Sequence, residues 1–237
     1  MSFRSSVIIV ASPRPRVGKT LLARLLIDFQ RHEGRAVKAF DLNVGDGRLA
    51  QFLPAVAAPA AIGDIKAQMA VFDTLVAGGD TVKIVDLGSP SFDAFFALAE
   101  KIGFAEETQR RGVAASILFV LTPDATSVDA YRALRRRFPG ATLTPVHNEM
   151  LGAAQYRDRY GLSVGETVTR LPVLAPALRK YVETPPFSFA ETELAAGIPL
   201  DAHIELQRWL RRVYLEFREL DLRILMTDLQ STIGLRP

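Results

Sequence analysis

The strongest restriction on the fold of this chain comes from its short apolar segments, which are nearly continuous rather than alternating in polarity. The first is SVIIVAS at 6–12, and similar β-branched runs recur along the sequence. Strands with this pattern are buried on both faces, as in a parallel sheet covered by helices on each side. The expected strands span residues 6–12, 36–43, 81–88, 115–122, 141–148 and 169–176.

Longer segments with helical periodicity separate these strands. In 19–34, leucines and Phe29 recur at helical spacing, and Gly34 is typical of a helix end. Further helices are expected at 63–79, 91–103 and 127–140, whereas the Ala/Pro-rich stretch 53–63 is expected to be a loop. This alternation predicts an α/β fold with a doubly wound, mainly parallel sheet.

The strand and helix alternation ends near residue 176, and the remaining pattern is mostly helical. We predict an α/β domain over 1–176 and a C-terminal helical extension over 177–237 that packs on the same domain. Within 201–230, a stripe with 4-3-4-3-4 spacing consists of Leu206, Leu210, Val213, Phe217, Leu220 and Ile224. So short a stripe favours packing on the domain over a coiled coil, and a role in dimerisation or partner binding stays open.

Composition excludes several classes of protein. Of the 237 residues, 49% are hydrophobic and 23% are charged, which is typical of a globular protein with a sizeable core. The absence of cysteine excludes disulfides and thiolate metal sites, and His32, His147 and His203 lack metal-ligand spacing. No apolar run approaches the roughly 20 residues of a membrane helix or resembles a signal peptide, so we expect a cytoplasmic protein.

The net charge of +3 does not point to a polyanionic partner. Arginine clusters occur at 110–111, 135–137 and 211–212, and they are expected on solvated helix faces because no aromatic residues interleave them. The sequence contains no clear nucleic-acid-binding motif.

The segment ASPRPRVGKT at 11–20 follows the first expected strand and precedes the first expected helix. In such a turn, backbone N–H groups bind phosphates, a lysine reaches the terminal phosphates, and the next hydroxyl ligates Mg²⁺. Lys19 and Thr20 take those two places. The nucleotide-binding residues expected here are Val17, Gly18, Lys19, Thr20 and Leu21.

The loop departs from the pattern G-x-x-x-x-G-K-[ST], because Pro13 stands at its first glycine. Pro13 and Pro15 have no N–H and a fixed φ, and Arg16 has a steric cost in any left-handed conformation. These residues predict weakened rather than abolished phosphate binding. The alternative is an ordinary strand-to-helix turn in which GKT occurs by chance.

Two aspartates end expected strands: Asp41 in FDLN and Asp86 in KIVDLGSP. Open α/β sheets bind ligands outside the carboxyl ends of their strands, where a carboxylate can order the shell of a bound Mg²⁺. Each aspartate alone fits an ordinary strand end or helix cap. Together with GKT after the first strand, they predict a nucleotide site.

These segments resemble the MinD/ParA-like ATPases with a deviant Walker A motif, whose loop reads K-G-G-V-G-K-T against RPRVGKT at 14–20 here. The resemblance covers roughly residues 5–176. Its other segments are VKAFDLNVGDGRLAQFL (37–53), VKIVDLGSP (82–90), ILFVLTPDATSVDAYRAL (117–134), PVHNEM (145–150) and LPVLAP (171–176).

The resemblance implies a P-loop fold with ATP and Mg²⁺ as cofactors. It implies that Lys19 contacts the β- and γ-phosphates, that Thr20 ligates Mg²⁺, and that Asp86 orders the water shell of the ion. Arg14 stands at the signature lysine, which in the family reaches the nucleotide of the other subunit in a homodimer. Arginine keeps the charge of that lysine but not its shape.

The resemblance also places Asp41 at the family's aspartate on the second strand, and Asn148 near the base. Arg14, Lys19, Asp41 and Asp86 are thus the expected catalytic set. The loop glycines of the family are Pro15 and Arg16 here, and the switch I aspartate is Asn43. An amide cannot replace a carboxylate base, so these departures affect hydrolysis more than binding.

The resemblance therefore implies an ATP-binding protein that dimerises in response to nucleotide, and the departures in the loop and at Asn43 predict weak or no ATPase activity. One alternative is a pseudo-ATPase that keeps the fold as a binding module without nucleotide. Another is an ATP-dependent ligase of the same broader fold, for which the chain offers no convincing acid and base set. A protein partner is possible, and the sequence does not identify it or decide between ATP and GTP.

Overall fold

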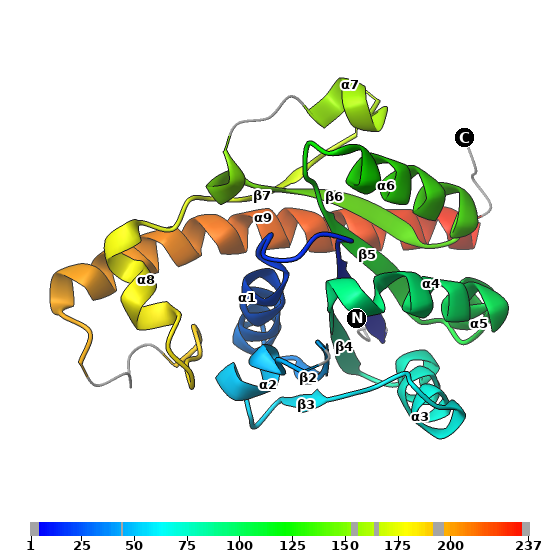
Figure 1. Ribbon diagram of the computed structural model, residues 1–237, viewed down its shortest axis with the longest axis horizontal. Coiled ribbons are helices and arrows are strands. Elements are labelled where there is room, and N and C mark those ends of the chain that lie inside the picture. The colour runs from blue at the N-terminus through cyan, green and yellow to red at the C-terminus, as the bar shows by residue number, and fades with distance from the viewer. Residues whose placement is uncertain (1–4, 44, 153–155, 164–165, 192–196, 234–237) are drawn as a thin grey trace.

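The computed structural model describes residues 5–43, 45–152, 156–163, 166–191 and 197–233, and in these ranges one sheet of seven parallel strands forms the centre of the molecule (Figure 1). The strand order is β3-β2-β4-β1-β5-β6-β7, so the first strand lies in the middle. The strands are β1 Ser6–Ala11, β2 Ala36–Leu42, β3 Ala57–Pro59, β4 Thr81–Leu87, β5 Ala114–Val120, β6 Thr142–Asn148 and β7 Thr169–Leu171.

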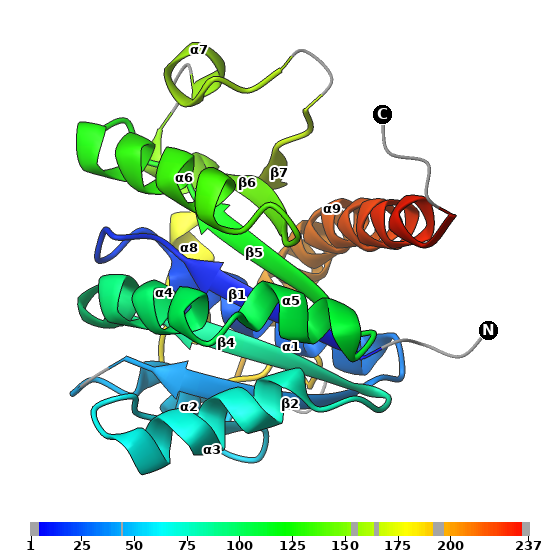
Figure 2. The same cartoon turned by 90° about the vertical axis from the view of Figure 1, so that its right-hand side faces the viewer.

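Helices cover both faces of the sheet (Figure 2). On one face α1, α2, α8 and α9 share a core, and on the other α3, α4, α5, α6 and α7 share a second core. The predicted doubly wound, parallel α/β fold is therefore confirmed. The helices are α1 Lys19–His32, α2 Arg48–Phe52, α3 Ile65–Val76, α4 Phe92–Lys101, α5 Phe104–Arg110, α6 Ala125–Arg137, α7 Tyr156–Tyr160, α8 Pro176–Val182 and α9 Leu200–Ile233.

Helix α1 starts directly after the loop that follows β1 and lies against the middle of the sheet. Its apolar side chains Leu22, Leu25 and Phe29 are almost completely buried. The helix ends as expected at a glycine, because Gly34 has a φ of 75° and its N–H donates to the carbonyl of Arg31. This packing fixes the position of the N-terminus of α1 at the carboxyl edge of the sheet.

The long helix α9 packs its predicted stripe on the domain. Leu206, Leu210, Val213, Phe217 and Leu220 are each at most 3% exposed, and Ile224 packs partly buried against the same core. The interpretation of this stripe as an intramolecular packing face is confirmed. Because α8 and α9 share a core with β1 and α1, the C-terminal part contributes to the main body, while the boundary at residue 176 stays a prediction.

Several short elements were not expected from the sequence. The stretch 53–63, predicted to be a loop, contains β3, which pairs with β2 at the edge of the sheet. A strand of three residues gives no polarity pattern, and Pro59 is tolerated there because edge strands leave one side unpaired. The short helices α2, α5 and α7 were not expected either.

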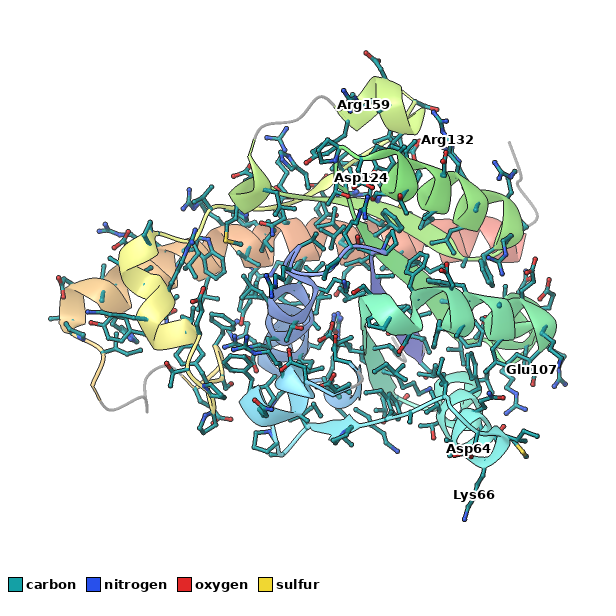
Figure 3. All side chains as sticks on the ribbon, in the orientation of Figure 1. Asp64, Lys66, Glu107, Asp124, Arg132 and Arg159 are labelled. Atoms are coloured by element: carbon teal, nitrogen blue, oxygen red, sulfur yellow. The ribbon has the colours of Figure 1, made fainter. Side chains whose placement is uncertain are left out.

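The arginine clusters near 110 and 135 lie on helix surfaces and pair with acidic residues. Arg110 donates to Glu107 on the same turn of α5 at 2.7 Å, and Arg137 donates to Glu100 of α4 at 2.9 Å. Figure 3 shows Glu107 at the periphery of the molecule. In the part of the chain that the structure describes, no helix combines the length and apolar character that a membrane span requires.

Candidate functional site

The loop between β1 and α1 keeps a strongly bent backbone despite its prolines. Gly18 has a φ of 93° and Arg16 has a φ of 58°, both in the left-handed region. Arg16 is the non-glycine residue with positive φ in the described ranges. The steric cost expected for Arg16 is therefore present in the folded structure, because its backbone has a left-handed conformation that favours glycine.

Replacing Arg16 by glycine should stabilise the protein. A left-handed residue with a Cβ costs about 1–2 kcal/mol, of which the greater freedom of glycine in the unfolded chain offsets about 0.5–1 kcal/mol. We expect Arg16→Gly to raise the free energy of unfolding by roughly 1 kcal/mol, measured by urea denaturation. Arg16→Ala is the matched control, because it removes the guanidinium but keeps the Cβ. An equal gain in both variants would contradict backbone strain as the cause.

Lys19 begins α1, and its ammonium group folds back over the loop. Lys19 is only 6% exposed, and its Nζ donates a hydrogen bond to the carbonyl oxygen of Arg14 at 2.6 Å. Burial lowers the pKa of Lys19 to about 8, and the nearby Asp86 carboxylate partly opposes that shift. A buried cation beside the first N–H groups of a helix, which have no intrahelical acceptors, is a favourable site for an anion.

Thr20 and Asp86 come together at the carboxyl ends of β1 and β4. The hydroxyl of Thr20 donates to Oδ2 of Asp86 at 2.7 Å. Asp86 is completely buried, and its other oxygen, Oδ1, has no hydrogen-bond partner among the described residues. Burial raises the pKa of Asp86 to about 6, the Thr20 bond lowers it, and the like charge of Asp41 raises it. A buried carboxylate oxygen without a protein donor is a position at which a water molecule or a cation can bind.

Asn43 links the two aspartates. Its amide nitrogen Nδ2 donates to Oδ1 of Asp41 at 2.7 Å and to Oδ2 of Asp86 at 2.9 Å. Asp41 and Asp86 are direct neighbours in the pairing of β2 with β4, so their carboxylates would otherwise repel each other. Asn43 therefore provides a donor at a point where an aspartate would add a third negative charge.

The second oxygen of Asp41 connects this cluster to α2. Oδ2 accepts from the N–H of Ala50 in the first turn of α2 at 3.0 Å, which satisfies one of the free donors of that helix. Close to this point Gly88 follows β4, and a Cβ on Gly88 would lie 2.8 Å from the carbonyl oxygen of Leu42. The glycine allows the ends of β2 and β4 to approach each other.

The residues at this edge fit a Mg²⁺ ion that is bound together with a nucleotide. Hard cations of this kind prefer oxygen ligands and keep several ligands from water and phosphate. Thr20 supplies a hydroxyl and Asp86 supplies the unpaired Oδ1. The described residues contain no group of three or more His, Asp or Glu side chains that could hold a metal alone. At this edge Thr20 and Asp86 would hold a Mg²⁺ ion whose remaining ligands would come from water or from phosphate oxygens.

Arg14 lies on the other side of the loop, in an ion pair that the sequence analysis did not anticipate. Its Nε and a terminal nitrogen lie 2.8 and 2.6 Å from Oδ1 of Asp124, at the N-terminus of α6 (Figure 3). Asp124 also accepts from the N–H of Ser127, so it caps α6. The Arg14 guanidinium holds the pKa of Asp124 well below its usual range. In the sequence, the sign of a structural role for Asp124 was its helix-capping position in the segment TPDATS.

Asn148 lies against the loop between β1 and α1, and both ends of its amide make hydrogen bonds. Nδ2 donates to the carbonyl oxygen of Val17 at 2.9 Å, and Oδ1 accepts from the N–H of Met150 at 3.1 Å. A Cβ on Gly18 would lie 2.5 Å from Nδ2, so the glycine is required by this contact as well as by its φ. Asn148 thus supports the loop, and its contact with a base stays a prediction.

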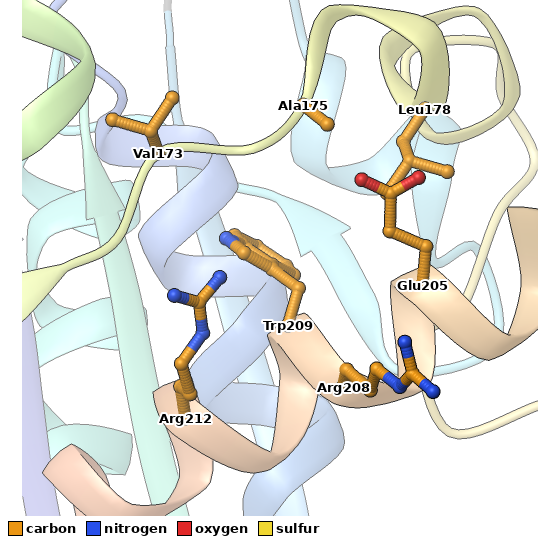
Figure 4. Close-up of a pocket in the computed structure, with 7 residues that line it drawn as sticks. All are labelled: Val173, Ala175, Leu178, Glu205, Arg208, Trp209 and Arg212. Atoms are coloured by element: carbon orange, nitrogen blue, oxygen red, sulfur yellow. The ribbon is translucent and has the colours of Figure 1, made fainter.

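The remaining expected residues frame the same loop. Val17 is buried, and Leu21 packs partly buried against the core below α1. Farther along the edge, Trp209 of α9 donates through Nε1 to the carbonyl oxygen of Pro172, at 3.1 Å. Figure 4 shows Trp209 between Arg208 and Arg212, in a pocket of about 280 Å³ between α9 and the connection from β7 to α8. Helix α9 therefore supports the connection between β7 and α8 through this hydrogen bond.

Solved structures of known proteins have the same fold. No protein-family model and no curated protein sequence matches the chain. The MinC:MinD cell division protein complex of Aquifex aeolicus has a TM-score of 0.52 at 17% identity, covering 87% of this chain and 95% of that chain. A ParA family ATPase from Chlorobium tepidum TLS has a TM-score of 0.51 at 11% identity, covering 88% and 98%.

The fold of this protein is therefore that of the P-loop NTPases. More particularly, it is a MinD/ParA-like P-loop fold, as the sequence resemblance predicted. At these levels of identity the similarity establishes the architecture, while the activity has to be argued from the residues of the site.

Proposed function

We propose that this protein binds ATP with Mg²⁺ and dimerises in response to the nucleotide, with slow or no hydrolysis. The observation that carries the proposal is the buried Oδ1 of Asp86 without a donor, next to the Thr20 hydroxyl and the buried ammonium of Lys19. The carboxylate of Asp86, the hydroxyl of Thr20 and the ammonium group of Lys19 lie together near the N-terminus of α1. Such a set of groups matches a Mg²⁺–polyphosphate ligand. MinD and ParA proteins have this fold. One solved structure of MinD is a complex with a protein partner, MinC.

Different residues of the site would bind different parts of the ligand. The backbone donors at 17–21 and Lys19 would hold the phosphates, and Thr20 and Asp86 would hold the ion. Asn148 keeps the loop in place through its bond to Val17. A bound Mg²⁺ neutralises phosphate charge and orients the terminal phosphate. When phosphate binds, the hydrogen bond from Lys19 to the Arg14 carbonyl has to be exchanged for bonds to the ligand.

Two features of the site support slow hydrolysis. Asn43 has an amide where a carboxylate could accept a proton from water, and that amide donates to Asp41 and Asp86. Arg14 is paired with Asp124 of its own chain, so contact with the nucleotide of a second subunit requires this ion pair to open. Both features leave binding intact while they limit chemistry.

A second candidate function is a pseudo-ATPase that uses the fold as a binding module. The left-handed Arg16 and the prolines at 13 and 15 favour it, because they reduce the number of donors and the freedom of the loop. The two candidates differ in one measurable property, which is whether the phosphate loop binds nucleotide.

Calorimetric titration of the purified protein with ATP, ADP and GTP, each with Mg²⁺, tests the proposal. We expect saturable binding of ATP that weakens strongly when EDTA removes the ion, because Thr20 and Asp86 act through Mg²⁺. Sedimentation with and without ATP then measures nucleotide-dependent dimerisation. Absence of binding at about 1 mM nucleotide, a free energy near −4 kcal/mol or weaker, would support the pseudo-ATPase instead.

A further inference from the structure

The pocket between α9 and the connection from β7 to α8 has a volume of about 280 Å³ and shares no residue with the phosphate site (Figure 4). It is lined by Val173, Ala175, Leu178, Glu205, Arg208, Trp209 and Arg212. Ligand pockets usually have volumes of roughly 300–1,000 Å³ and combine an apolar lining with a few polar groups. This pocket lies at the lower end of that range, which suits a small organic molecule.

The apolar part of the pocket has a fixed wall and an exposed one. Trp209 is 2% exposed, and its Nε1 donates to the carbonyl oxygen of Pro172 at 3.1 Å, so the indole is held in place. Leu178 of α8 is also buried, whereas Val173 is 48% exposed. A ligand that covers Val173 removes apolar surface from water, which favours a ligand with a hydrocarbon body.

The polar part of the pocket contains two arginines without an acidic partner. In the ranges that the structure describes, the side chains of Arg208 and Arg212 take part in no ion pair or hydrogen bond. The arginines of α5 and α6 differ in this respect, since Arg110 pairs with Glu107 and Arg137 pairs with Glu100. The guanidinium groups in the pocket are therefore available to a ligand, and a guanidinium can bind both oxygens of a carboxylate.

Glu205 limits the charge of the ligand that the pocket can accept. It lies seven residues before Arg212 on the same helix, a separation of about 10 Å along the axis, and Figure 4 shows the two at opposite ends of the lining. Two arginines against one glutamate leave one net positive charge. A singly charged carboxylate matches this charge, whereas Glu205 repels a doubly charged phosphate more strongly.

We propose that this pocket binds a small carboxylate with an apolar body, such as an aliphatic acid. The carboxylate pairs with the guanidinium of Arg212, and the hydrocarbon covers Val173 and packs against Trp209 and Leu178. Binding requires neither the phosphate loop nor a nucleotide, so the proposal goes beyond the proposed function and does not rest on it.

Fluorescence titration tests the proposal, because Trp209 is the single tryptophan of the chain and lines the pocket. We expect hexanoate to change the tryptophan emission saturably, with an affinity that rises about threefold for each CH₂ in the series acetate, butyrate and hexanoate. Hexanamide, which has no charge, should bind at least about tenfold more weakly, and inorganic phosphate should not compete. Saturation-transfer NMR of hexanoate measures the same binding without relying on the tryptophan.

The substitution Arg212→Gln should weaken hexanoate binding about tenfold. Arg211→Gln is the matched control, because Arg211 is exposed on the next position of α9 and does not line the pocket. Glu205→Gln should strengthen binding, since it removes a like charge, and Val173→Asp should abolish it. Circular dichroism of each variant checks the fold.

Four results would overturn the proposal. These are no binding by either method at about 10 mM hexanoate, equal binding of hexanamide, equal effects of Arg211→Gln and Arg212→Gln, and tight binding by Val173→Asp. Lys19→Ala separates the pocket from the nucleotide site, because it should bind hexanoate like the wild type. If ATP displaces hexanoate from the wild type but not from Lys19→Ala, the pocket belongs to the nucleotide site and the proposal fails. If ATP does not bind at all and hexanoate does, the proposed function fails and the carboxylate site stands.

Discussion

Replacing Lys19 by alanine should lower the affinity for ATP and Mg²⁺ by roughly ten- to a hundredfold. Hydrogen bonds to charged groups contribute about 1.5–3 kcal/mol each, and 1.4 kcal/mol corresponds to a factor of ten. Lys19 is buried beside the loop, with Nζ 2.6 Å from the Arg14 carbonyl, so its charge already points into the site. The measurement is calorimetric titration of the variant and the wild type under identical conditions.

The pH dependence of ATP binding gives this prediction a second test. Burial lowers the pKa of Lys19 to about 8 in the free protein, and the phosphates of a ligand raise it again. The bound form is the protonated one, so wild-type affinity should decrease above pH 8 with uptake of a proton on binding. Lys19→Ala should lack that component. Lys180→Ala on α8, an exposed lysine, is the control that should bind like the wild type.

If Lys19→Ala bound ATP as tightly as the wild type, the nucleotide would have to lie away from the loop at 11–20. If it bound more weakly but without any change in pH dependence, the lysine would act through the shape of the loop rather than through its charge. Each result would change the assignment of the phosphate site.

Replacing Asp86 by asparagine should stabilise the protein without ligand at neutral pH. The pKa of Asp86 rises from 3.8 to about 6 on folding, because the carboxylate is completely buried. A raised carboxyl pKa favours folding below the unfolded value, and that contribution is lost as the pH rises through 6. A shift of about two pKa units corresponds to about 3 kcal/mol, so the gain of Asp86→Asn should grow from near zero at pH 4 to at most about 3 kcal/mol at pH 7.5.

Urea denaturation at several pH values between 4 and 8 measures this difference. The same variant should lose the Mg²⁺-dependent part of ATP binding, because its amide cannot replace the unpaired Oδ1 as an anionic ligand. Asp124→Asn is the contrasting control. The pKa of Asp124 lies below its usual range, and asparagine still caps α6, so that substitution should destabilise the protein at neutral pH. A gain in stability for Asp124→Asn, or a loss for Asp86→Asn, would contradict this account of the charges.

The substitutions of these two aspartates are expected to change the stability of the protein in opposite directions, because the two carboxylates have different partners. Asp124 has its cation, Arg14, within the folded chain. Among the described residues, Asp86 has donors from Thr20 and Asn43 on one oxygen and none on the other. A residue that costs stability at rest and gains a partner when a ligand arrives is typical of a functional site.

Several parts of the site could be predicted because they depend on local sequence. A buried strand followed by GKT and a helix places Lys19 and Thr20 at a helix N-terminus, whatever the rest of the chain does. Strand ends place Asp41 and Asp86 at the carboxyl edge, since parallel strands share that edge. Their roles in catalysis and metal binding stay predictions.

Other contacts join segments that lie far apart in the sequence. The ion pair of Arg14 with Asp124 spans β1 and α6, and the support of Val17 by Asn148 spans β1 and β6. Strand β3 was missed for a different reason: three residues carry too little periodicity to indicate a strand, and pairing with β2 supplies the order that propensity does not.

By itself, the sequence determined the class of fold, the strand-to-helix turn that precedes α1 and the inward face of α9. These follow from the periodicity of apolar residues and from turn chemistry, both of which act over a few neighbouring residues. The tertiary structure alone decided that Arg16 takes a left-handed conformation and that Arg14 pairs with Asp124. It also decided that Asp86 has one oxygen without a donor in the part of the chain that the structure describes. Those properties depend on which groups burial deprives of water, and that is settled only when distant segments pack together.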